Sequence, residues 1–102
     1  MRLENESEKL LKETILRIIG KHLNLDQYRV FFFGSRVSGR GNERSDIDVG
    51  IEGKQPLPVG VLSGIRDEIE DLPILYRIDI VDFARVNEKF KAVAKEHIEL
   101  VN

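Results

Sequence analysis

The chain has 102 residues, of which 41% are hydrophobic and 33% charged, a size and composition that fit one compact domain over residues 1–102. Its 16 Lys and Arg against 18 Asp and Glu give a net charge of −2, which excludes a global basic field that would attract nucleic acid. The absence of cysteine excludes a disulfide framework, a thiolate zinc site and a cysteine nucleophile.

No segment of the sequence has the pattern of a membrane span or a signal peptide. The longest purely apolar run, Val30–Phe33, is far shorter than the roughly 20 residues that a spanning helix needs. Residues 1–9 are too acidic and polar for a signal peptide. We therefore expect a cytoplasmic protein with no membrane partner.

The first predicted element is an amphipathic helix from Glu6 to His22. Asn5 and Glu8 have the spacing of a capping box, in which each side chain satisfies an unpaired backbone N–H at the start of the helix. The apolar residues that recur at helical spacing, and so form the expected buried stripe, are Leu10, Leu11, Ile15, Ile18 and Ile19.

Two strands follow, separated by a polar turn. The run from Arg29 to Phe33 is short, apolar and β-rich, which is typical of a strand buried on both faces. Residues 35–45 are polar, contain two glycines and are expected to hold one short helical turn. The run from Asp46 to Glu52 alternates strictly, and is the clearest strand signal in the chain.

The second half of the chain predicts a helix from Val59 to Asp71, a strand from Ile74 to Phe83 and a last helix from Asn87 to His97. The residues of the last helix that are expected to point inward are Phe90, Val93 and Ala94. The order helix, strand, turn, strand, helix, strand, helix predicts an α/β (α+β) domain of two or three layers on a small sheet.

Carboxylates gather on one face of the second predicted strand. Because successive side chains of a strand point to opposite faces, Asp46 and Asp48 share a face and their Cα atoms lie about 6–7 Å apart. Such a pair repels itself unless a cation lies between its members, so it is a candidate divalent-metal site. The bland alternative is that Asp46 caps the turn and Asp48 faces water.

The end of the first strand carries a candidate phosphate site. Gly34 allows a ligand to approach the backbone closely, and the Ser35 hydroxyl can donate to a phosphate oxygen. A helical turn that starts at Ser35 would add backbone amides as anion ligands. Ten residues separate Ser35 from Asp46, so a tight return can bring the phosphate site beside the carboxylates.

The third predicted strand offers a further carboxylate. If Ile78 and Ile80 pack into the core, Asp79 projects on the same side as Asp46 and Asp48, whereas Asp82 has the opposite parity and is expected to be a strand-end or helix-capping group. The sequence leaves open whether Arg77, which shares the parity of Asp79, pairs with the acidic cluster or touches a phosphate.

The histidines and tyrosines are assigned structural rather than catalytic roles. His22 and His97 each lie near a helix end and are expected to be solvated or to cap the helix. Tyr28 and Tyr76 lie at strand starts and are expected to be structural rather than to stack on a base.

The run GSRVSGRGNERSDIDV, from Gly34 to Val49, resembles the Gly-Ser-x10-Asp-x-Asp signature of DNA polymerase β-like nucleotidyltransferases. Length and segment order are most similar to the minimal nucleotidyltransferases (MNT), the MntA-like antitoxins of HEPN/MNT modules, over nearly the whole chain. The resemblance implies the polymerase β-like nucleotidyltransferase fold, a small mixed sheet flanked by helices.

The resemblance also implies roles for the residues of the signature. Gly34 and Ser35 would hold the phosphates of the nucleotide, and Asp46 and Asp48 would ligate two Mg²⁺ ions. Asp79 would complete the catalytic triad and ligate the catalytic ion.

One position departs from the family's pattern. Arg36 and Gly39 match it, but many members have Arg just before the glycine, where this chain has Ser38 and places Arg40 after the glycine. Arg36 and Arg40 are therefore both candidates for binding the triphosphate, and the sequence leaves open which of them does so.

The activity that the resemblance implies is metal-dependent transfer to an acceptor of a nucleoside monophosphate, which is AMP when the donor is ATP and the corresponding monophosphate when it is another nucleoside triphosphate. The implied acceptor is a tyrosine of a HEPN-type toxin, with this chain as the antitoxin and protein adenylyltransferase. A partner or a second copy of the chain is expected to complete the pocket. The alternatives are a non-catalytic binding module that neutralises its partner by association, and a nucleic-acid-modifying enzyme, which the acidic balance disfavours.

Overall fold

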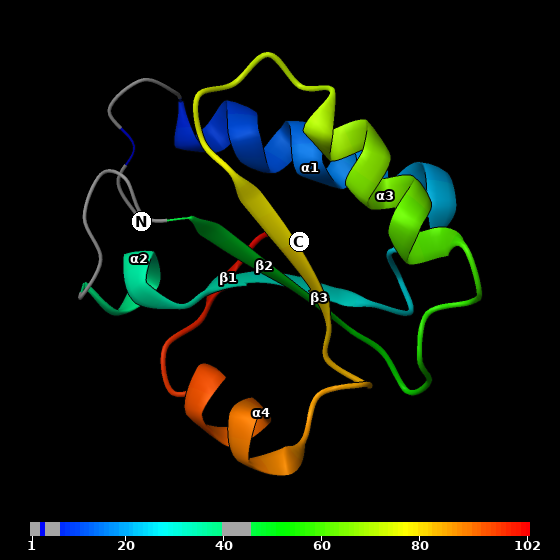
Figure 1. Ribbon diagram of the computed structural model, residues 1–102, viewed down its shortest axis with the longest axis vertical. Coiled ribbons are helices and arrows are strands. Elements are labelled where there is room, and N and C mark those ends of the chain that lie inside the picture. Colours follow the sequence, from blue (N-terminus) through cyan, green and yellow to red (C-terminus); the bar gives the residue numbers. More distant parts are fainter. Residues whose placement is uncertain (1–2, 4–6, 40–45) are drawn as a thin grey trace.

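The structure is a computed structural model that describes residue 3 and residues 7–39 and 46–102. The described residues form a four-stranded sheet in the order β3-β2-β1-β4, with helices on both of its faces (Figure 1). In chain order the elements are α1 (Glu8–His22), β1 (Arg29–Phe33), α2 (Ser35–Ser38), β2 (Ile47–Glu52), α3 (Val61–Glu70), β3 (Ile78–Asp82), α4 (Glu88–Ala94) and β4 (Glu99–Leu100).

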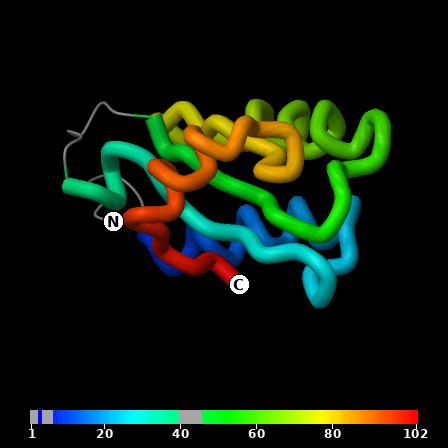
Figure 2. Tube along the Cα trace, turned by 90° about the horizontal axis from the view of Figure 1, so that it is seen from below, coloured from blue at the N-terminus to red at the C-terminus, as the bar shows by residue number. Residues whose placement is uncertain are grey.

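The sheet is mixed, as the resemblance implies. β1 runs antiparallel to both β2 and β4, whereas β2 and β3 are parallel and are joined through α3. α1 and α3 cover one face of the sheet, and α4 lies against the other (Figure 1). Seen from the side of α4, the end of the chain returns alongside β1 (Figure 2).

Strict alternation along the strands gives the two faces of the sheet separate cores. The main core lies under α1 and α3 and is almost entirely aliphatic. Its buried strand residues are Val30, Phe32, Ile47, Val49, Ile51 and Ile80, and its buried helix residues include Leu11, Ile15, Ile18, Ile19, Ile65 and Ile69. This burial of apolar side chains is the main term that stabilises the sheet.

The second core is smaller and aromatic. The Phe83 ring lies 4.8 Å from the Phe31 ring and 5.0 Å from the Phe33 ring, both in edge-to-face geometry. Gly50 of β2 makes room for this packing, because a Cβ there would overlap the rings of Phe31 and Phe83. Ala94 of α4 packs against the same cluster, so α4 forms a third layer.

Several predicted boundaries and burial assignments are wrong. α1 is capped by Ser7, whose side chain accepts a hydrogen bond from the Leu10 N–H, and Leu10 is itself exposed rather than part of the buried stripe. Asn5 lies outside the described residues. β1 has the predicted bounds, whereas β3 begins at Ile78 rather than Ile74, because β2 offers a pairing partner only from Ile47 onward.

The C-terminal part differs most from expectation. α4 ends at Ala94 rather than His97, and the two-residue strand β4 was not predicted, since two residues carry no alternation signal. Phe90 and Val93 were expected to point inward but are 43% and 61% exposed. None of the helices in the described ranges combines the length and apolar character needed to cross a membrane.

Candidate functional site

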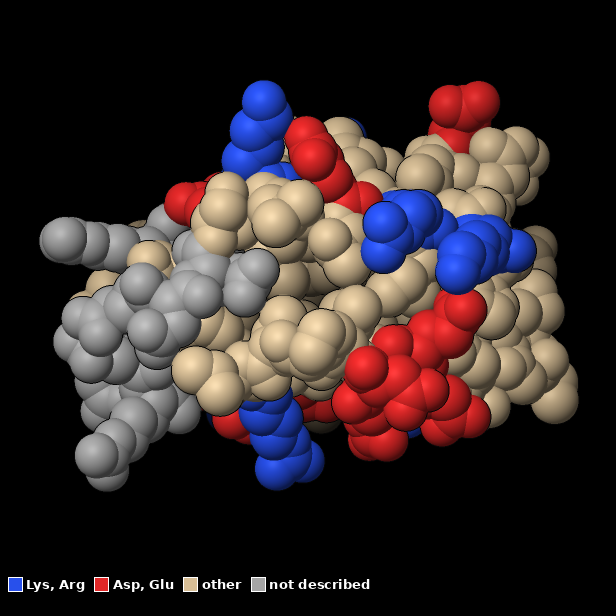
Figure 3. Space-filling view, turned by 90° about the horizontal axis from the view of Figure 1, so that it is seen from above, with Lys and Arg blue, Asp and Glu red and all other residues tan. Residues whose placement is uncertain are grey.

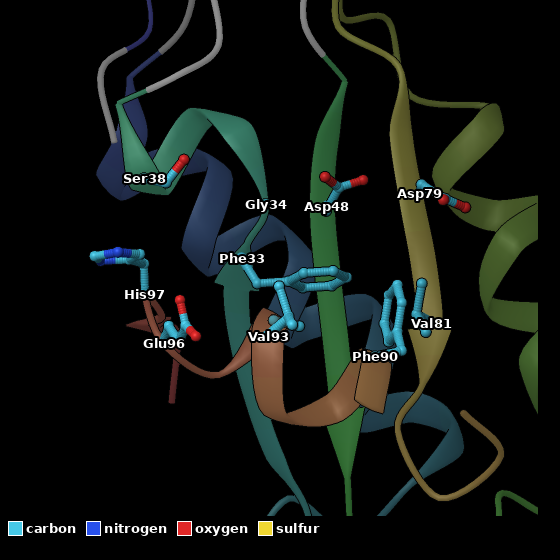
Figure 4. Close-up of a pocket in the computed structure, with 11 residues that line it drawn as sticks. Phe33, Gly34, Ser38, Asp48, Asp79, Val81, Phe90, Val93, Glu96 and His97 are labelled. Carbon is cyan, nitrogen blue, oxygen red and sulfur yellow. The ribbon is translucent and has the colours of Figure 1, made fainter. Parts of the chain in front are cut away.

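The register of the sheet brings two of the predicted carboxylates side by side. In the parallel pairing of β2 and β3, Asp48 lies directly opposite Asp79. Their neighbours Ile47, Val49 and Ile80 are buried in the main core, so both carboxylates project from the other face of the sheet, the face that carries α4 (Figure 4). Asp46 comes just before β2 with the same parity.

Gly34 lies at the end of β1, next to the side chain of Asp48. Phe33 pairs with Asp48, and the next residue, Gly34, has φ of 84°, a left-handed conformation that glycine adopts without strain. A Cβ at Gly34 would overlap the Oδ2 of Asp48. The glycine is therefore required both for the turn into α2 and for the close approach of the backbone to the carboxylate.

The position of Asp48 makes its carboxylate hard to ionise. Burial, together with the smaller effects of the negative charges of Asp79 and Asp46, raises its pKa to about 6. A cation bound beside Asp48 would oppose the effect of the neighbouring charges on its pKa.

Arg77 and Asp82 lie on either side of Asp79 in the sequence and make different contacts. Arg77 Nε lies 3.9 Å from Asp46 Oδ2, so of the two roles left open for Arg77 the structure contains the ion pair with the acidic cluster. Asp82 has the predicted structural role: it is buried, and its two oxygens accept hydrogen bonds from the Leu57 and Ala84 N–H groups at 2.9 and 3.0 Å.

Only some of the predicted phosphate-binding residues lie beside the carboxylates. Arg36 lies over the ring of Tyr76, with its guanidinium carbon 4.8 Å from the ring centre, which is a cation–π contact. α2 begins at Ser35, as predicted, but Ser38 rather than Ser35 lines the cavity described below. Arg40 lies outside the described residues.

A cavity of about 390 Å³ joins the carboxylates to α4 (Figure 4). Its walls are acidic at Asp48, Asp79 and Glu96 and otherwise mostly apolar. The remaining lining residues are Phe33, Gly34, Ser38, Val81, Phe90, Val93, Ala94 and His97. Sequence analysis missed the lining residues Phe90, Val93 and Ala94 because it assigned them to the core, and His97 because it assigned it to a helix end. The signal that could have found them is the recurrence of Phe90 and Val93 at positions i and i+3.

The two histidines have different environments, and His97 has the exposure that was predicted for it. His22 is half-buried, and its Nε2 lies 2.8 Å from Glu68 of α3, so it links α1 to α3 instead of facing solvent. This contact lowers the pKa of Glu68. His97 is exposed, as predicted, and also lines the cavity. Tyr28 packs against the main core, in agreement with its predicted structural role.

Whether a metal ion fits this site depends on which ligand atoms the surrounding side chains supply. Asp46, Asp48 and Asp79 supply only carboxylate oxygens, which are the ligands that Mg²⁺ prefers. In the described ranges no three His, Cys, Asp or Glu side chains are close enough to form a ready-made metal site, and the Asp79 carboxylate points away from Asp48 (Figure 4). The donor chemistry therefore fits, and binding by all three carboxylates requires the Asp79 side chain to turn.

The surface charge agrees with the low net charge of the sequence. On the face seen from above, acidic and basic side chains lie close to one another, and the described residues form no continuous basic stripe there (Figure 3). The part of this face that the described residues form therefore lacks the electrostatic footprint of a nucleic-acid-binding surface.

Comparison with known proteins agrees with this arrangement. The chain is similar to the probable protein adenylyltransferase MntA of Haemophilus influenzae, with 28% identity over 95 residues, which cover 92% of this chain and 79% of that protein. Two solved structures share the fold, each with a TM-score of 0.70. One, a toxin–antitoxin with AMP-PNP, is 14% identical and covers 89% of this chain and 72% of its own. The other, a tri-AMPylated Shewanella oneidensis HEPN toxin in complex with MNT antitoxin, is 12% identical and covers 94% of this chain and 72% of its own.

The family assignment comes from a match over nearly the whole sequence. Residues 5–102 match the family described as Polymerase beta, Nucleotidyltransferase, and this span includes the Gly34–Ser35 turn and all three carboxylates. The chain therefore belongs to the polymerase beta nucleotidyltransferase family and is a nucleotidyltransferase.

Proposed function

We propose that this chain transfers AMP from ATP to a hydroxyl group of a partner protein, and that the acceptor is a tyrosine of a HEPN-type toxin. The observation that carries the proposal is the pairing of Asp48 with Asp79 on adjacent parallel strands, with Gly34 held against Asp48. This arrangement concentrates negative charge beside a backbone turn that has no side chain to block a phosphate.

The transfer is a single displacement at phosphorus. The acceptor's hydroxyl group gives up its proton to solvent while its oxygen forms a bond to the α-phosphorus, the bond from that phosphorus to the bridging oxygen breaks, and pyrophosphate leaves. Asp46, Asp48 and Asp79 would hold two Mg²⁺ ions. Such a pair of ions stabilises both the attacking and the leaving oxygen.

The residues of the chain have separate tasks in this step. Gly34 keeps the turn open at the position where the phosphates would lie, and Ser35, Arg36 or Arg40 would neutralise their charge. The carboxylates of Asp48 and Asp79 repel a nucleotide that arrives without a cation, so we expect metal and nucleotide to bind together. Nucleotidyltransferases of this family generally use divalent metals.

The choice of nucleotide and acceptor rests on the similar proteins. The similar Haemophilus protein is described as a probable protein adenylyltransferase, and the two structural neighbours contain AMP-PNP or an AMPylated HEPN toxin. An antitoxin of this kind would inactivate its toxin by modifying it. Because the reaction consumes ATP, we expect it to take place in the cytoplasm.

The test is transfer of label from α-³²P ATP to the purified HEPN-type partner in the presence of Mg²⁺. We expect the partner to become labelled from α-labelled ATP and not from γ-labelled ATP, because AMP rather than the terminal phosphate is transferred. Asp48→Asn should reduce the rate by about 100-fold or more. Asp67→Asn, which removes an exposed carboxylate of α3, should retain the wild-type rate.

Two results would contradict the proposal. Tight association with the partner but no labelling would identify the chain as a binding module. Equal labelling by the wild type and Asp48→Asn would remove the carboxylates from the mechanism.

A further inference from the structure

α4 presents an apolar surface to the cavity that holds the carboxylates. Phe90 and Val93 are one helical turn apart, and both are largely exposed, at 43% and 61%. Both nevertheless line the cavity, together with Phe33 of β1 and Val81 of β3 (Figure 4). We call Phe33, Val81, Phe90 and Val93 the apolar wall.

The apolar wall is fixed in place by contacts on two sides of α4. Lys91 and Lys95, also one turn apart, form ion pairs with Glu52 of β2 at 3.4 and 2.6 Å, which sets the rotation of the helix against the sheet. The Phe90 ring packs against the Phe33 and Phe83 rings, at centroid distances of 6.1 and 6.0 Å. These contacts hold the apolar wall in position before any ligand binds, so its exposure is a consequence of the fold.

The cavity changes from acidic to apolar within a very short distance. Asp79 and Val81 are two residues apart on the same face of β3, so their Cα atoms are separated by about 6–7 Å. A nucleotide makes the same change along its length, from charged phosphates through the ribose to a flat aromatic base.

We propose that the apolar wall binds the nucleobase of the nucleotide whose α-phosphate lies at the carboxylates. The inference rests on the proposed function and adds a binding surface for the base to it. A base stacks favourably on aromatic and aliphatic side chains in a sequence-tolerant manner, because every base has a π-face.

The main competitor for this surface is the aromatic ring of the acceptor, and the chemistry of the cavity favours the nucleoside. The only polar atom of a phenol ring is the oxygen that reacts, whereas Ser38, Glu96 and His97 add hydrogen-bonding groups to the lining. A nucleoside has ribose hydroxyls and ring nitrogens to meet such groups. A volume of about 390 Å³ is ample for a nucleoside.

The experiment compares the binding of ATP with that of inorganic tripolyphosphate, both with Mg²⁺ and without an acceptor, by calorimetry on the full chain. Tripolyphosphate has the three linked phosphates of ATP but lacks the nucleoside. We expect the wild type to bind ATP at least about tenfold more tightly than tripolyphosphate, and Phe90→Ala to lose most of this difference. Binding of tripolyphosphate itself should be unchanged.

A second variant covers the case in which Phe90→Ala disturbs the aromatic core. Val93→Gln changes an exposed side chain of the apolar wall, and we expect it to weaken ATP binding by about threefold to fivefold without affecting tripolyphosphate. Val59→Gln is the matched control, since Val59 is fully exposed outside the cavity, and it should bind both ligands as the wild type does.

The outcomes separate this inference from the proposed function. Equal affinity of the wild type for ATP and tripolyphosphate would overturn the base site and leave the phosphate and metal site standing. Variants that bind ATP normally but raise the KM for the acceptor would assign the apolar wall to the acceptor. A wild type that binds neither ligand would overturn both proposals.

Discussion

Asp48 is the residue on which the electrostatics of the site converge. It faces Asp79 across the β2–β3 pairing, follows Asp46 by two residues and touches the backbone turn at Gly34. Burial and these neighbouring charges raise its pKa to about 6. At neutral pH the folded protein without metal therefore carries a charge that it stabilises poorly.

This environment predicts that Asp48→Asn stabilises the metal-free protein at pH 7.5. Because the pKa is raised in the folded state, the group contributes stability while protonated, and this contribution is lost as the pH rises from about 4 through about 6. With allowance for solvent screening, we expect a gain on the order of 1 kcal/mol, or about 4–8 °C in Tm. Urea unfolding of the wild type and the variant at pH 7.5 and at pH 4 measures this gain in stability.

The pH dependence and Mg²⁺ provide the controls for this prediction. At pH 4 the difference between Asp48→Asn and the wild type should disappear, because Asp48 is then protonated in the folded protein. Mg²⁺ at pH 7.5 should stabilise the wild type more than the variant. A variant less stable than the wild type at pH 7.5 would refute the raised pKa.

The faces of β2 and β3 were the most predictable features of the sheet, since the alternation of apolar and polar side chains fixes which face each residue occupies. The parity of Asp48, Asp79 and Asp82 could be read from the sequence for this reason, and the structure confirms it. The roles of Asp46, Asp48 and Asp79 as metal ligands stay predictions. The direction of α4 was not predictable, because the ion pairs between its lysines and Glu52 join segments far apart in the sequence.

Parity in β3 predicts opposite consequences for two aspartates three residues apart. Asp79→Ala removes an exposed carboxylate, so we expect a change in stability within about 0.5 kcal/mol and a loss of activity of about 100-fold or more. Asp82→Ala removes a buried acceptor of two backbone N–H groups and should lower the free energy of unfolding by about 2–3 kcal/mol. Chemical unfolding and label transfer measure the two effects.

Label transfer measured below the unfolding temperature of each variant distinguishes the two aspartates. Asp82→Ala should retain label transfer wherever it is folded, whereas Asp79→Ala should be inactive although folded. If Asp82→Ala were folded and inactive, or Asp79→Ala active, the assignment of a structural and a functional aspartate would be wrong.

At the scale of the whole molecule, the order of elements was predictable but their arrangement was only partly so. The sequence indicates an α/β (α+β) domain on a small sheet, and the family match and the structure confirm this. The sheet order β3-β2-β1-β4 depends on pairing between distant segments, including the short strand β4, which the sequence did not indicate. The third layer depends on how α4 is held against the second core.

The ion pairs of Glu52 with Lys91 and Lys95 join the third layer, α4, to the rest of the molecule. Burial opposes ionisation of Glu52, but its ion pairs with Lys95 and Lys91 outweigh that effect and hold the Glu52 pKa below its usual range. A carboxylate of lowered pKa stabilises the fold above its unfolded-state pKa, and this contribution is lost as the pH falls through the folded-state value.

Glu52→Gln should therefore lower the free energy of unfolding by about 1 kcal/mol at pH 7, and the difference from the wild type should shrink as the pH is lowered below about 4. Urea unfolding at the two pH values measures this. Glu70→Gln is the control, because Glu70 is an exposed residue of α3 on the opposite face of the sheet, and it should have the wild-type stability. A Glu52→Gln variant as stable as the wild type at pH 7 would mean that the aromatic core alone holds α4, and that the two lysines only cover the surface.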